Sequence, residues 1–498
     1  MNNPLSILTF LPLLGALLVA LLPARKTALI RAAGILFSLA ALGFALHLTF
    51  QYDRSAGGLQ FVEKFAWIPA LHIEYSLAVD GLSLLLVVLT GFVTAFALFA
   101  LGDRSTKAGV ALILTLQTTL FGVFTAFNFI HWFLYYELSL IPAFFLIRMG
   151  SGEKATRAAT QFFLYTFFAG FAMLLGFLAV HHATGTFNLA ELAAREVEPA
   201  LRAAFPGKWI PALIFVAIFA GLAVKVPVVP FHTWLPDAYA EAPTPVSMLL
   251  TGLLSKMGVY GFLRLLWPLF PEMMREWQTP LFCFALATII YSAFAALAQK
   301  DLKRIIAYSS VNHLGYCLLG LFAVAAAVTD HGHNRAAAMN GVLLQIFNHG
   351  LTASALFCFI GFLERRSGGL RGLNDFGGLR HAAPVFAGLM GIALFSSLGL
   401  PGLNGFVGEF LIFKGSFGLA PIPTAFAVIG LFVTAVFLLT IIERVFTGPL
   451  PARWRAFPDL TAGERCMVAP AIALMFVLGI FPQLLIALFN QTVLQLLP

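Results

Sequence analysis

Long runs of apolar residues, separated by short polar loops, dominate this chain. An α-helix of about 20 apolar residues is long enough to cross the hydrocarbon of a bilayer. Scanned with a window of about 19 residues, the sequence contains about fourteen such runs. Strands of a membrane barrel would instead alternate apolar and polar residues over about ten positions. The pattern therefore predicts an all-α integral membrane protein with about 14 transmembrane helices.

Two of the predicted spans, the seventh and the twelfth, are interrupted. Pro227 follows Lys225 in the seventh, and Pro401 precedes Glu409 in the twelfth. Proline removes a backbone donor and clashes with the preceding turn, and paired broken helices are a pointer to the ion path of a transporter. The fourteen spans are predicted at 4–22, 28–50, 78–101, 108–125, 128–147, 159–180, 209–230, 244–268, 279–298, 305–327, 336–363, 384–413, 422–443 and 466–490.

The two breaks lie five spans apart, which suggests two five-helix repeats. Because five is an odd number, the second repeat would be inverted relative to the first, and inverted repeats commonly enclose a site at the membrane midplane. The chain is then predicted to contain an N-terminal three-helix region (1–107), a first repeat (108–268), a second repeat (279–443) and a C-terminal loop and helix (444–498).

Composition agrees with a membrane protein. Hydrophobic residues make up 60% of the chain and charged residues 10%, whereas soluble domains contain about 25% charged residues. A soluble enzyme, a disordered chain and a secreted disulfide scaffold are therefore excluded. Most of the 30 lysines and arginines fall in loops on the side opposite the termini, so the positive-inside rule predicts that both termini lie outside the cytoplasm.

Four charged residues remain inside predicted spans: Glu137, Lys225, Lys256 and Glu409. A lysine at the bilayer centre costs about 2.5–3.5 kcal/mol on insertion scales. Two structural ion pairs are the alternative, but buried pairs contribute little stability, and intramembrane charges usually mark a transport path. A buried ammonium loses its proton readily and holds it more firmly when a carboxylate approaches. We therefore predict a proton path, with Glu137 and Lys225 as one pair and Lys256 passing protons to Glu409.

Two histidines in predicted spans, His313 and His349, are candidates for the link between Lys256 and Glu409. Imidazole titrates near neutral pH, which suits a proton relay. A single histidine on a membrane helix is equally often a packing residue, but two of them between a lysine and a glutamate favour the relay.

Other charged residues are interpreted as helix caps or loop anchors. Asp80 is expected to cap the third span, and Glu364 with the segment 300–304 is placed at the membrane surface. The sequence has no Walker A or GxSxG motif, no GxGxxG after a strand, and no cysteine or histidine spacing typical of metals. No cofactor and no metal ion is therefore predicted for this chain.

Several stretches resemble the antiporter-like membrane subunits of respiratory complex I, the NADH–quinone oxidoreductase, and most closely the branch called subunit M. The resemblance extends from the first predicted span to the last. Its most specific segments are YELSLIPAFFLI (136–147), KVPVVPFHTWLPDAYAEAPTPVSMLLTGLLSKMGVYGFLR (225–264), AQKDLKRIIAYSSVNHLGY (298–316), NHGLTASALF (348–357) and LGLPGLNGFVGEFL (398–411).

The resemblance implies fourteen core helices with helices 7 and 12 broken, inverted repeats, and proton translocation without redox chemistry in this chain. By motif, Glu137 matches the family's glutamate on helix 5, and Lys225 matches its central lysine partner. Lys256 matches the lysine on helix 8. Glu409 matches the position on helix 12 where the other branches usually carry a lysine.

The resemblance also implies the protein's surroundings. FMN, iron–sulfur clusters and quinone would be bound by other subunits, and the L-like and N-like antiporter paralogues would be neighbours of this chain. The membrane would be the bacterial inner membrane, with both termini on the periplasmic side. An Mrp-type cation/proton antiporter subunit and a membrane subunit of a hydrogenase-related complex are the alternatives. A purely structural scaffold would need neither the four charges in the spans nor the two broken helices.

Overall fold

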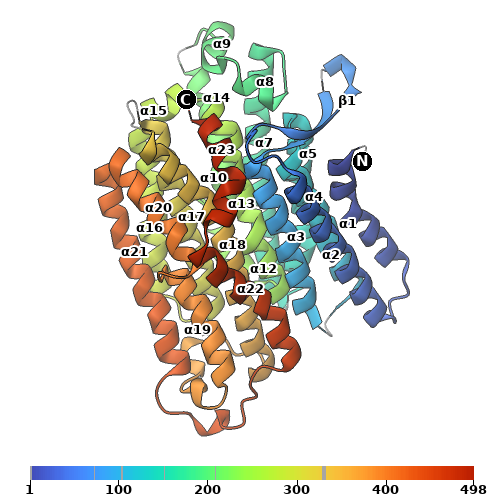
Figure 1. Ribbon diagram of the computed structural model, residues 1–498, viewed down its shortest axis with the longest axis vertical. Helices are drawn as coiled ribbons and strands as arrows, with labels where there is room; N and C mark the ends of the chain where they lie inside the picture. Colours follow the sequence, from blue (N-terminus) through green and yellow to red (C-terminus); the bar gives the residue numbers. More distant parts are fainter. Residues whose placement is uncertain are drawn as a thin grey trace.

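A computed structural model describes residues 3–71, 73–102, 105–150, 152–207, 209–327 and 332–497. Most helices run roughly parallel or antiparallel to one another and form an elongated bundle (Figure 1). Twelve helices in the described ranges are long and apolar enough to cross a membrane. The predicted all-α membrane fold is thus confirmed, while the number of fourteen spans, the inverted repeats and the four domain boundaries stay predictions.

A β-hairpin on the termini side of the bundle was not predicted. Its strands pair in antiparallel fashion between the second and third helices. The buried Glu63 on the first strand accepts a hydrogen bond from the Leu5 amide at 2.6 Å, so the hairpin fixes the start of the first helix. The N-terminal elements are α1 (Pro4–Leu21), α2 (Thr27–Gln51), β1 (Gln60–Ile68), η1 (Pro69–Leu71), β2 (Ile73–Val79) and α3 (Gly81–Leu101).

The next part of the chain contains the first predicted break. Helix α10 ends at Lys225, and regular helix resumes only at Trp234. These elements are α4 (Lys107–Thr125), α5 (Phe129–Leu138), α6 (Leu140–Arg148), α7 (Gly152–Thr184), α8 (Leu189–Ala193), α9 (Val197–Ala204), α10 (Ile210–Lys225), α11 (Trp234–Glu241), α12 (Thr244–Leu249), η3 (Leu250–Leu254), α13 (Ser255–Gly261), η4 (Phe262–Leu266), α14 (Trp267–Leu269) and α15 (Pro271–Glu276).

The second predicted break is also present, since α19 ends before Gly399, whose φ of +80° stops the helix. The remaining elements are α16 (Gln278–Leu297), α17 (Leu302–Ala326), α18 (His333–Ser367), η5 (Leu373–Asp375), η6 (Leu379–His381), α19 (Pro384–Leu398), α20 (Asn404–Leu419), α21 (Pro421–Ile441), η7 (Ile442–Phe446), η8 (Ala452–Trp454), α22 (Ala462–Ile480) and α23 (Gln483–Leu496).

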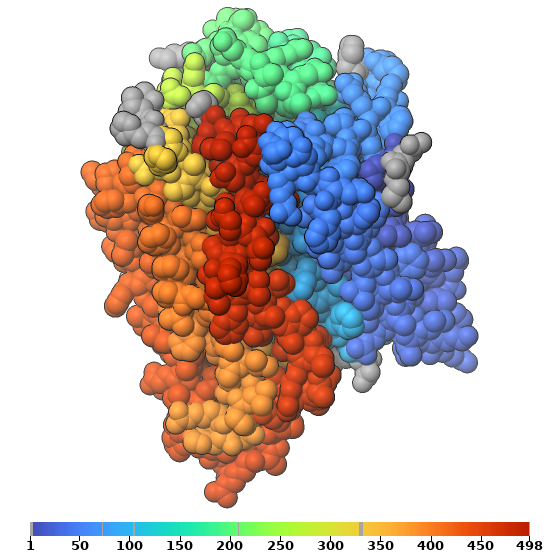
Figure 2. Space-filling model, viewed as in Figure 1, coloured from blue at the N-terminus to red at the C-terminus, as the bar shows by residue number. Residues whose placement is uncertain are grey.

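The last predicted span, 466–490, differs from the structure. It is divided between α22 and α23, because Pro482 cannot donate the backbone hydrogen bond that would continue α22. These two helices lie between the N-terminal helices and the second half of the chain on the face seen in Figure 2.

Three segments form the centre of the bundle: α12–α14, α17 and α18. Of their most apolar windows, 100%, 94% and 100% of the residues are buried, whereas the value for α7 is 33%. Helix α18 packs against α20, α17 and α12. Polar side chains on these central helices therefore meet protein rather than lipid.

Candidate functional site

Four of the predicted site residues lie in one buried row that crosses the second half of the bundle. Lys256 Nζ is 2.7 Å from His349 Nδ1, and the ring centres of His349 and His313 are 5.2 Å apart. His313 Nδ1 is in turn 3.0 Å from Glu409 Oε1. All four side chains are buried. Helices α13, α18, α17 and α20 thus bring together proton-binding groups that are far apart in the sequence.

Neutral side chains hold the histidine end of this row in place. Gln345 Nε2 lies 3.3 Å from Glu409 Oε1 and 3.4 Å from His313 Nδ1. Ser397 Oγ lies 3.2 Å from His313 Nε2. A small cavity of ≈ 10 Å³ is bordered by both histidines, Gln345 and Glu409, which is about the space that one water molecule needs.

Lys256 is surrounded by hydrogen-bond acceptors rather than by a carboxylate. Its ammonium donates to the backbone carbonyl of Thr251 and lies 3.4 Å from Ser255 Oγ. Thr251 belongs to η3, a π-helical turn directly before α13. Turns of this type often occur at functional sites, and this one supplies the carbonyl that holds the lysine.

Glu137 and Lys225 form the second group of predicted site residues. Lys225 Nζ lies 4.8 Å from the ring centre of Tyr136, which stabilises the cation through the aromatic face. Glu137 and Lys225 are close enough to interact electrostatically. Within the described part of the chain, however, neither Lys225 Nζ nor Glu137 Oε1 has a hydrogen-bond partner. The pair is therefore present but not in contact.

The carboxylate of Glu137 depends on a glycine of the neighbouring helix. A Cβ atom added to Gly170 on α7 would lie 2.0 Å from Glu137 Oε1. Only a residue without a side chain leaves room there. Among the described residues, no hydrogen bond joins Lys225 to Lys256, although α13 packs closely on the residue after Lys225, where a Cβ at Gly258 would lie 2.6 Å from Val226 Cγ2. The predicted residues thus lie in two groups.

Comparison with known proteins identifies the family to which the chain belongs. Residues 126–437 match the family described as NADH:quinone oxidoreductase/Mrp antiporter, transmembrane. The NADH-quinone oxidoreductase subunit M of Rhodobacter capsulatus is 36% identical over 100% of this chain and 96% of its own length. That of Rickettsia felis is 33% identical over 99% and 98%. The chain belongs to this family.

Solved structures of family members and related complexes have the same fold. A chain of respiratory complex I from Thermus thermophilus aligns with a TM-score of 0.85 and 27% identity, covering 99% of this chain and 100% of that one. A chain of the Mrp complex from Dietzia sp. DQ12-45-1b aligns with a TM-score of 0.84 at 23% identity, covering 99% and 97%. The resemblance to antiporter-like subunits that the sequence motifs suggested is thereby confirmed.

Sequence reasoning missed a buried ion pair on the termini side of this family member. Asp80 caps α3, as predicted, by accepting a hydrogen bond from the Ser83 amide. Its other oxygen lies 2.6 Å from Arg264, whose side chain is only 9% exposed. Arg264 lies eight residues after Lys256 on the same helical segment. Eight residues correspond to about two helical turns. This spacing of two basic residues on one helical segment was the signal that the sequence offered for a second buried cation.

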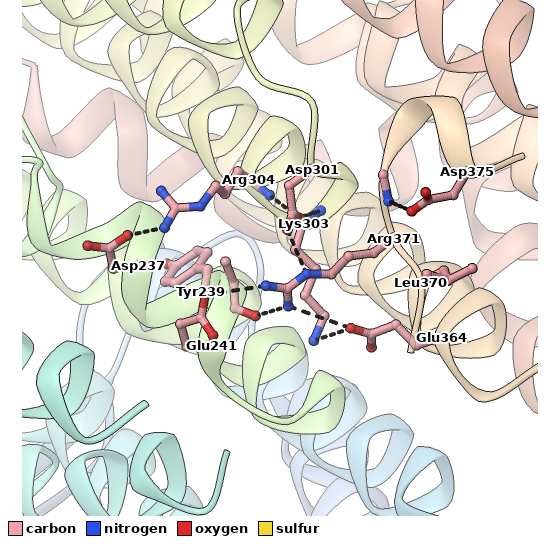
Figure 3. A network of polar contacts seen from close by, with 12 residues as sticks. Asp237, Tyr239, Glu241, Asp301, Lys303, Arg304, Glu364, Leu370, Arg371 and Asp375 are labelled. Carbon is pink, nitrogen blue, oxygen red and sulfur yellow. Dashed lines mark hydrogen bonds and ion pairs between the residues drawn. The ribbon is translucent and has the colours of Figure 1, made fainter. Parts of the chain in front are cut away.

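A second missed feature lies near the opposite face (Figure 3). Lys303, placed at the membrane surface by the sequence, is only 3% exposed and lies 3.2 Å from Glu364. The guanidinium of Arg371 lies 2.6 Å from Asp301 and 3.3 Å from Glu241. These ion pairs join α11 and α17 to the end of α18 and the loop after it. The sequence could not show this, because the partners are separated by long stretches of chain.

Proposed function

We propose that this chain is the subunit M of a bacterial NADH-quinone oxidoreductase and that it carries protons across the membrane while sister subunits reduce quinone. The observation that carries this proposal is the buried row from Lys256 through two histidines to Glu409. Each member can bind and release a proton, and none can change its redox state. The relatives named NADH-quinone oxidoreductase subunit M cover nearly the same length as this chain.

The Glu137–Lys225 pair, the first pair along the proton path, would supply protons to it. When Glu137 approaches Lys225, the ammonium form is favoured, and when the carboxylate withdraws the lysine gives up its proton more readily. The separated arrangement of this pair corresponds to the releasing state. Movement of Glu137 past Gly170, under the influence of a neighbouring subunit, would switch between the two states.

The buried row would carry the proton onward. Lys256 donates to His349, which rotates or passes the proton through one water to His313, and Glu409 receives it. Glu409 lies beside the second break, since a Cβ at Gly399 would be 2.7 Å from Glu409 Oε2. The open turn between α19 and α20 gives this carboxylate a way to water that an unbroken helix would block.

The surroundings follow from the same proposal. FMN, iron–sulfur clusters and quinone would be bound by sister subunits, and the L-like and N-like paralogues would flank this chain. The membrane would be the bacterial inner membrane, with both termini on the periplasmic side. Exposed apolar side chains on α7, such as Phe168 and Phe171, suit contact with lipid or with a neighbouring membrane subunit.

The test uses the assembled complex in native membranes. We expect Glu137→Gln, Lys225→Ala and Lys256→Ala each to lower quinone reduction and proton pumping together, because removal of a proton-transfer group typically costs on the order of 100-fold in the step it serves. Glu443→Gln, on the exposed surface, is the control, and native gels report assembly.

Two outcomes would contradict the proposal. Full activity in an assembled Lys256→Ala complex would mean that the buried row does not carry protons. Transport that depends on sodium rather than on quinone reduction would favour an Mrp-type antiporter, which has the same fold.

A further inference from the structure

A cavity of ≈ 640 Å³ lies at the face of the bundle opposite the termini. The ends of α3 and α6 border it on one side, and the α11–α12 loop and the end of α18 border it on the other. Its charged lining includes Lys303, Glu364 and Arg371. The cavity is large enough for many water molecules, and the function proposed above gives it no role.

Glu364 lies between this cavity and helix α12. Its Oε1 atom is 3.2 Å from Lys303 Nζ and 3.7 Å from Arg371 Nη1. Its Oε2 atom accepts a hydrogen bond from Thr244 Oγ1 at 2.8 Å. The side chain is 19% exposed. One oxygen therefore contacts the cations, and the other points at the first turn of the helix that leads to Lys256.

A row of hydroxyl groups follows along that helix. Thr244, Ser247, Thr251 and Ser255 are three or four residues apart, so they share one face of α12 and η3, and all are buried. The row ends at Lys256, whose ammonium lies 3.4 Å from Ser255 Oγ and donates to the Thr251 carbonyl. Same-face residues one turn apart are separated by about 5–6 Å between Cβ atoms. Within the row, Ser247 Oγ donates to the Tyr239 carbonyl at 2.7 Å, and Thr251 Oγ1 lies 2.9 Å from Ser310 Oγ.

Helix α18 seals this row from the lipid. A Cβ at Gly361 would lie 2.6 Å from Thr244 Cγ2, and one at Gly350 would lie 2.9 Å from the Gly252 carbonyl. Between these contacts, Ser354 donates a hydrogen bond to the Met248 carbonyl at 3.0 Å. The backbone of α18 is thus in close contact with α12 and η3 along the whole row of hydroxyl groups. The Thr244 end of this row borders the cavity.

We propose that this cavity is a proton entrance of its own and that Glu364 supplies Lys256 with protons from the face opposite the termini. This inference rests on the proton-carrying function proposed above. Protonated Glu364 gives its proton to Thr244 or to a bridging water, each hydroxyl passes one proton on as it receives one, and neutral Lys256 takes the last. The Glu364 carboxylate then regains a proton from water in the cavity, so that charge and protons balance.

The entrance accounts for the separation of the two site groups. Lys256 would then have a second source of protons besides Lys225, to which no hydrogen bond connects it among the described residues. Lys303 and Arg371 would hold the Glu364 carboxylate between proton deliveries. The row from Lys256 to Glu409 would then take up protons from the cavity as well as from the first pair.

The first test is Glu364→Gln in the assembled complex, compared with Glu364→Asp and with Asp237→Asn. Glutamine keeps the size of the side chain and an acceptor for Thr244 but cannot carry a proton. Asp237 belongs to the same group of ion pairs, 2.5 Å from Arg304, but does not line the cavity. We expect Glu364→Gln to lower proton pumping by about tenfold or more, Glu364→Asp to retain much of it, and Asp237→Asn to pump normally.

Normal pumping by Glu364→Gln, while Lys256→Ala is inactive, would overturn the entrance and leave the proposed function intact. Normal pumping by both variants would overturn the proposed function itself. Equal loss in Glu364→Gln and Asp237→Asn would show that the ion pairs are structural, and the entrance would again be wrong.

A second measurement covers the case in which Glu364→Gln fails to assemble. In complexes with Cys283 and Cys466 replaced by serine, Ser247→Cys is treated with a small membrane-impermeant thiol reagent. We expect labelling only from the face opposite the termini. No labelling from that face would mean that water does not reach the hydroxyl row, which would contradict the inference.

Discussion

Lys256 and Lys225 illustrate two ways of keeping a lysine inside a membrane protein. Lys256 has a histidine nitrogen, a backbone carbonyl and a hydroxyl around its ammonium, so the proton can pass directly to an imidazole. Lys225 has aromatic faces instead. An aromatic face attracts the cation but cannot take its proton. Lys225 therefore needs a mobile carboxylate, and Lys256 does not.

Gly170 provides a residue-scale prediction about that carboxylate. In Gly170→Ala the new methyl group would occupy the place of Glu137 Oε1, 2.0 Å away, and would push the carboxylate out of its position. We expect quinone reduction and pumping to fall nearly as far as in Glu137→Gln, while native gels show an assembled complex. Gly388→Ala is the control, because nothing lies within 4 Å of a Cβ at that position. Equal activity in the two alanine variants would show that the position of Glu137 is unimportant.

The charged residues of both site groups were visible in the sequence, because Glu137, Lys225, Lys256 and Glu409 stand alone in apolar surroundings. The placement of two histidines between Lys256 and Glu409 was also expected, but the order of His349 and His313 was not. Arg264 and Lys303 were not recognised, since both lie near helix ends, where a basic residue normally reaches water. Whether such a residue is buried is decided by helices far away in the sequence, and a single sequence does not contain that information.

At the scale of elements, the break between α19 and α20 positions the carboxylate of Glu409. Gly399 and Gly402 both have positive φ values, +80° and +94°, in the turn between α19 and α20. Only Gly399 is near Glu409, since a Cβ at Gly402 would contact nothing within 4 Å. The two glycines have the same conformational requirement and differ in their distance from the site.

This difference gives a matched pair of variants. Alanine at either position should cost about 1–2 kcal/mol of conformational strain. Gly399→Ala should also displace Glu409 and lower pumping several-fold below that of Gly402→Ala. Proton pumping by the two purified complexes, compared with their thermal stabilities, separates the effects. If both variants lose activity in proportion to stability alone, contact with Glu409 is not the cause.

A pH-dependent contact is predicted outside the membrane spans, where α9 meets α15. Glu198 is buried and accepts hydrogen bonds from the amides of Glu272 and Met273, and burial raises the pKa of Glu198 to about 7. A raised pKa means that the folded contact binds the proton more tightly than the open form does. The stabilisation is therefore complete below about pH 4.5 and is lost as the pH rises through about 7.

Amide hydrogen exchange over residues 197–204 and 271–276 measures this effect. We expect protection to be greater at pH 5.5 than at pH 8.5, after correction for intrinsic exchange rates. Glu198→Gln should be equally protected at both values, because glutamine does not titrate. A wild-type protein without this difference would rule out titration of Glu198 at the contact.

The breaks at Lys225 and before Glu409 were predictable from proline and glycine, but the division at Pro482 and the hairpin were not. A window as long as a membrane helix averages the hydropathy of a short strand such as β1 with that of its neighbours. Around Pro482, the hydropathy of the apolar residues outweighs that of a single proline. Short elements are detected only with a shorter window. Over so few residues, the strands and loops of a membrane protein have similar hydropathy patterns.

At the scale of the whole molecule, the central helices form a protein interior for the polar row, and peripheral helices face outward. Polar side chains can therefore line α12, α17 and α18 without meeting lipid. The sequence predicts which segments span the membrane, but not which of them are central, because central and peripheral spans have similar apolar composition.

The ion pairs in Figure 3 hold the two halves of the molecule together. Arg371 contacts Glu241, Asp301 and Glu364 and donates to the Ala240 carbonyl. We expect Arg371→Ala to lower the melting temperature of the purified complex by several degrees, because it removes the shared cationic partner of three partly buried carboxylates. Arg380→Ala, on the exposed surface, should have no such effect. Equal melting temperatures for the two variants would mean that the pairs do not hold the halves together.

The contact of Glu63 with the start of α1 has a consequence for how the chain is made. The ribosome synthesises α1 well before residue 63, so the first helix enters the membrane with its opening amides unbound. The bond to the Leu5 amide forms only after the second helix has returned the chain to the side of the N-terminus. A newborn chain in which only one of the first two helices crosses the membrane would lack this bond, because Leu5 and Glu63 would lie on opposite sides. The bond to Glu63 thus forms only when both helices have crossed, early in biogenesis.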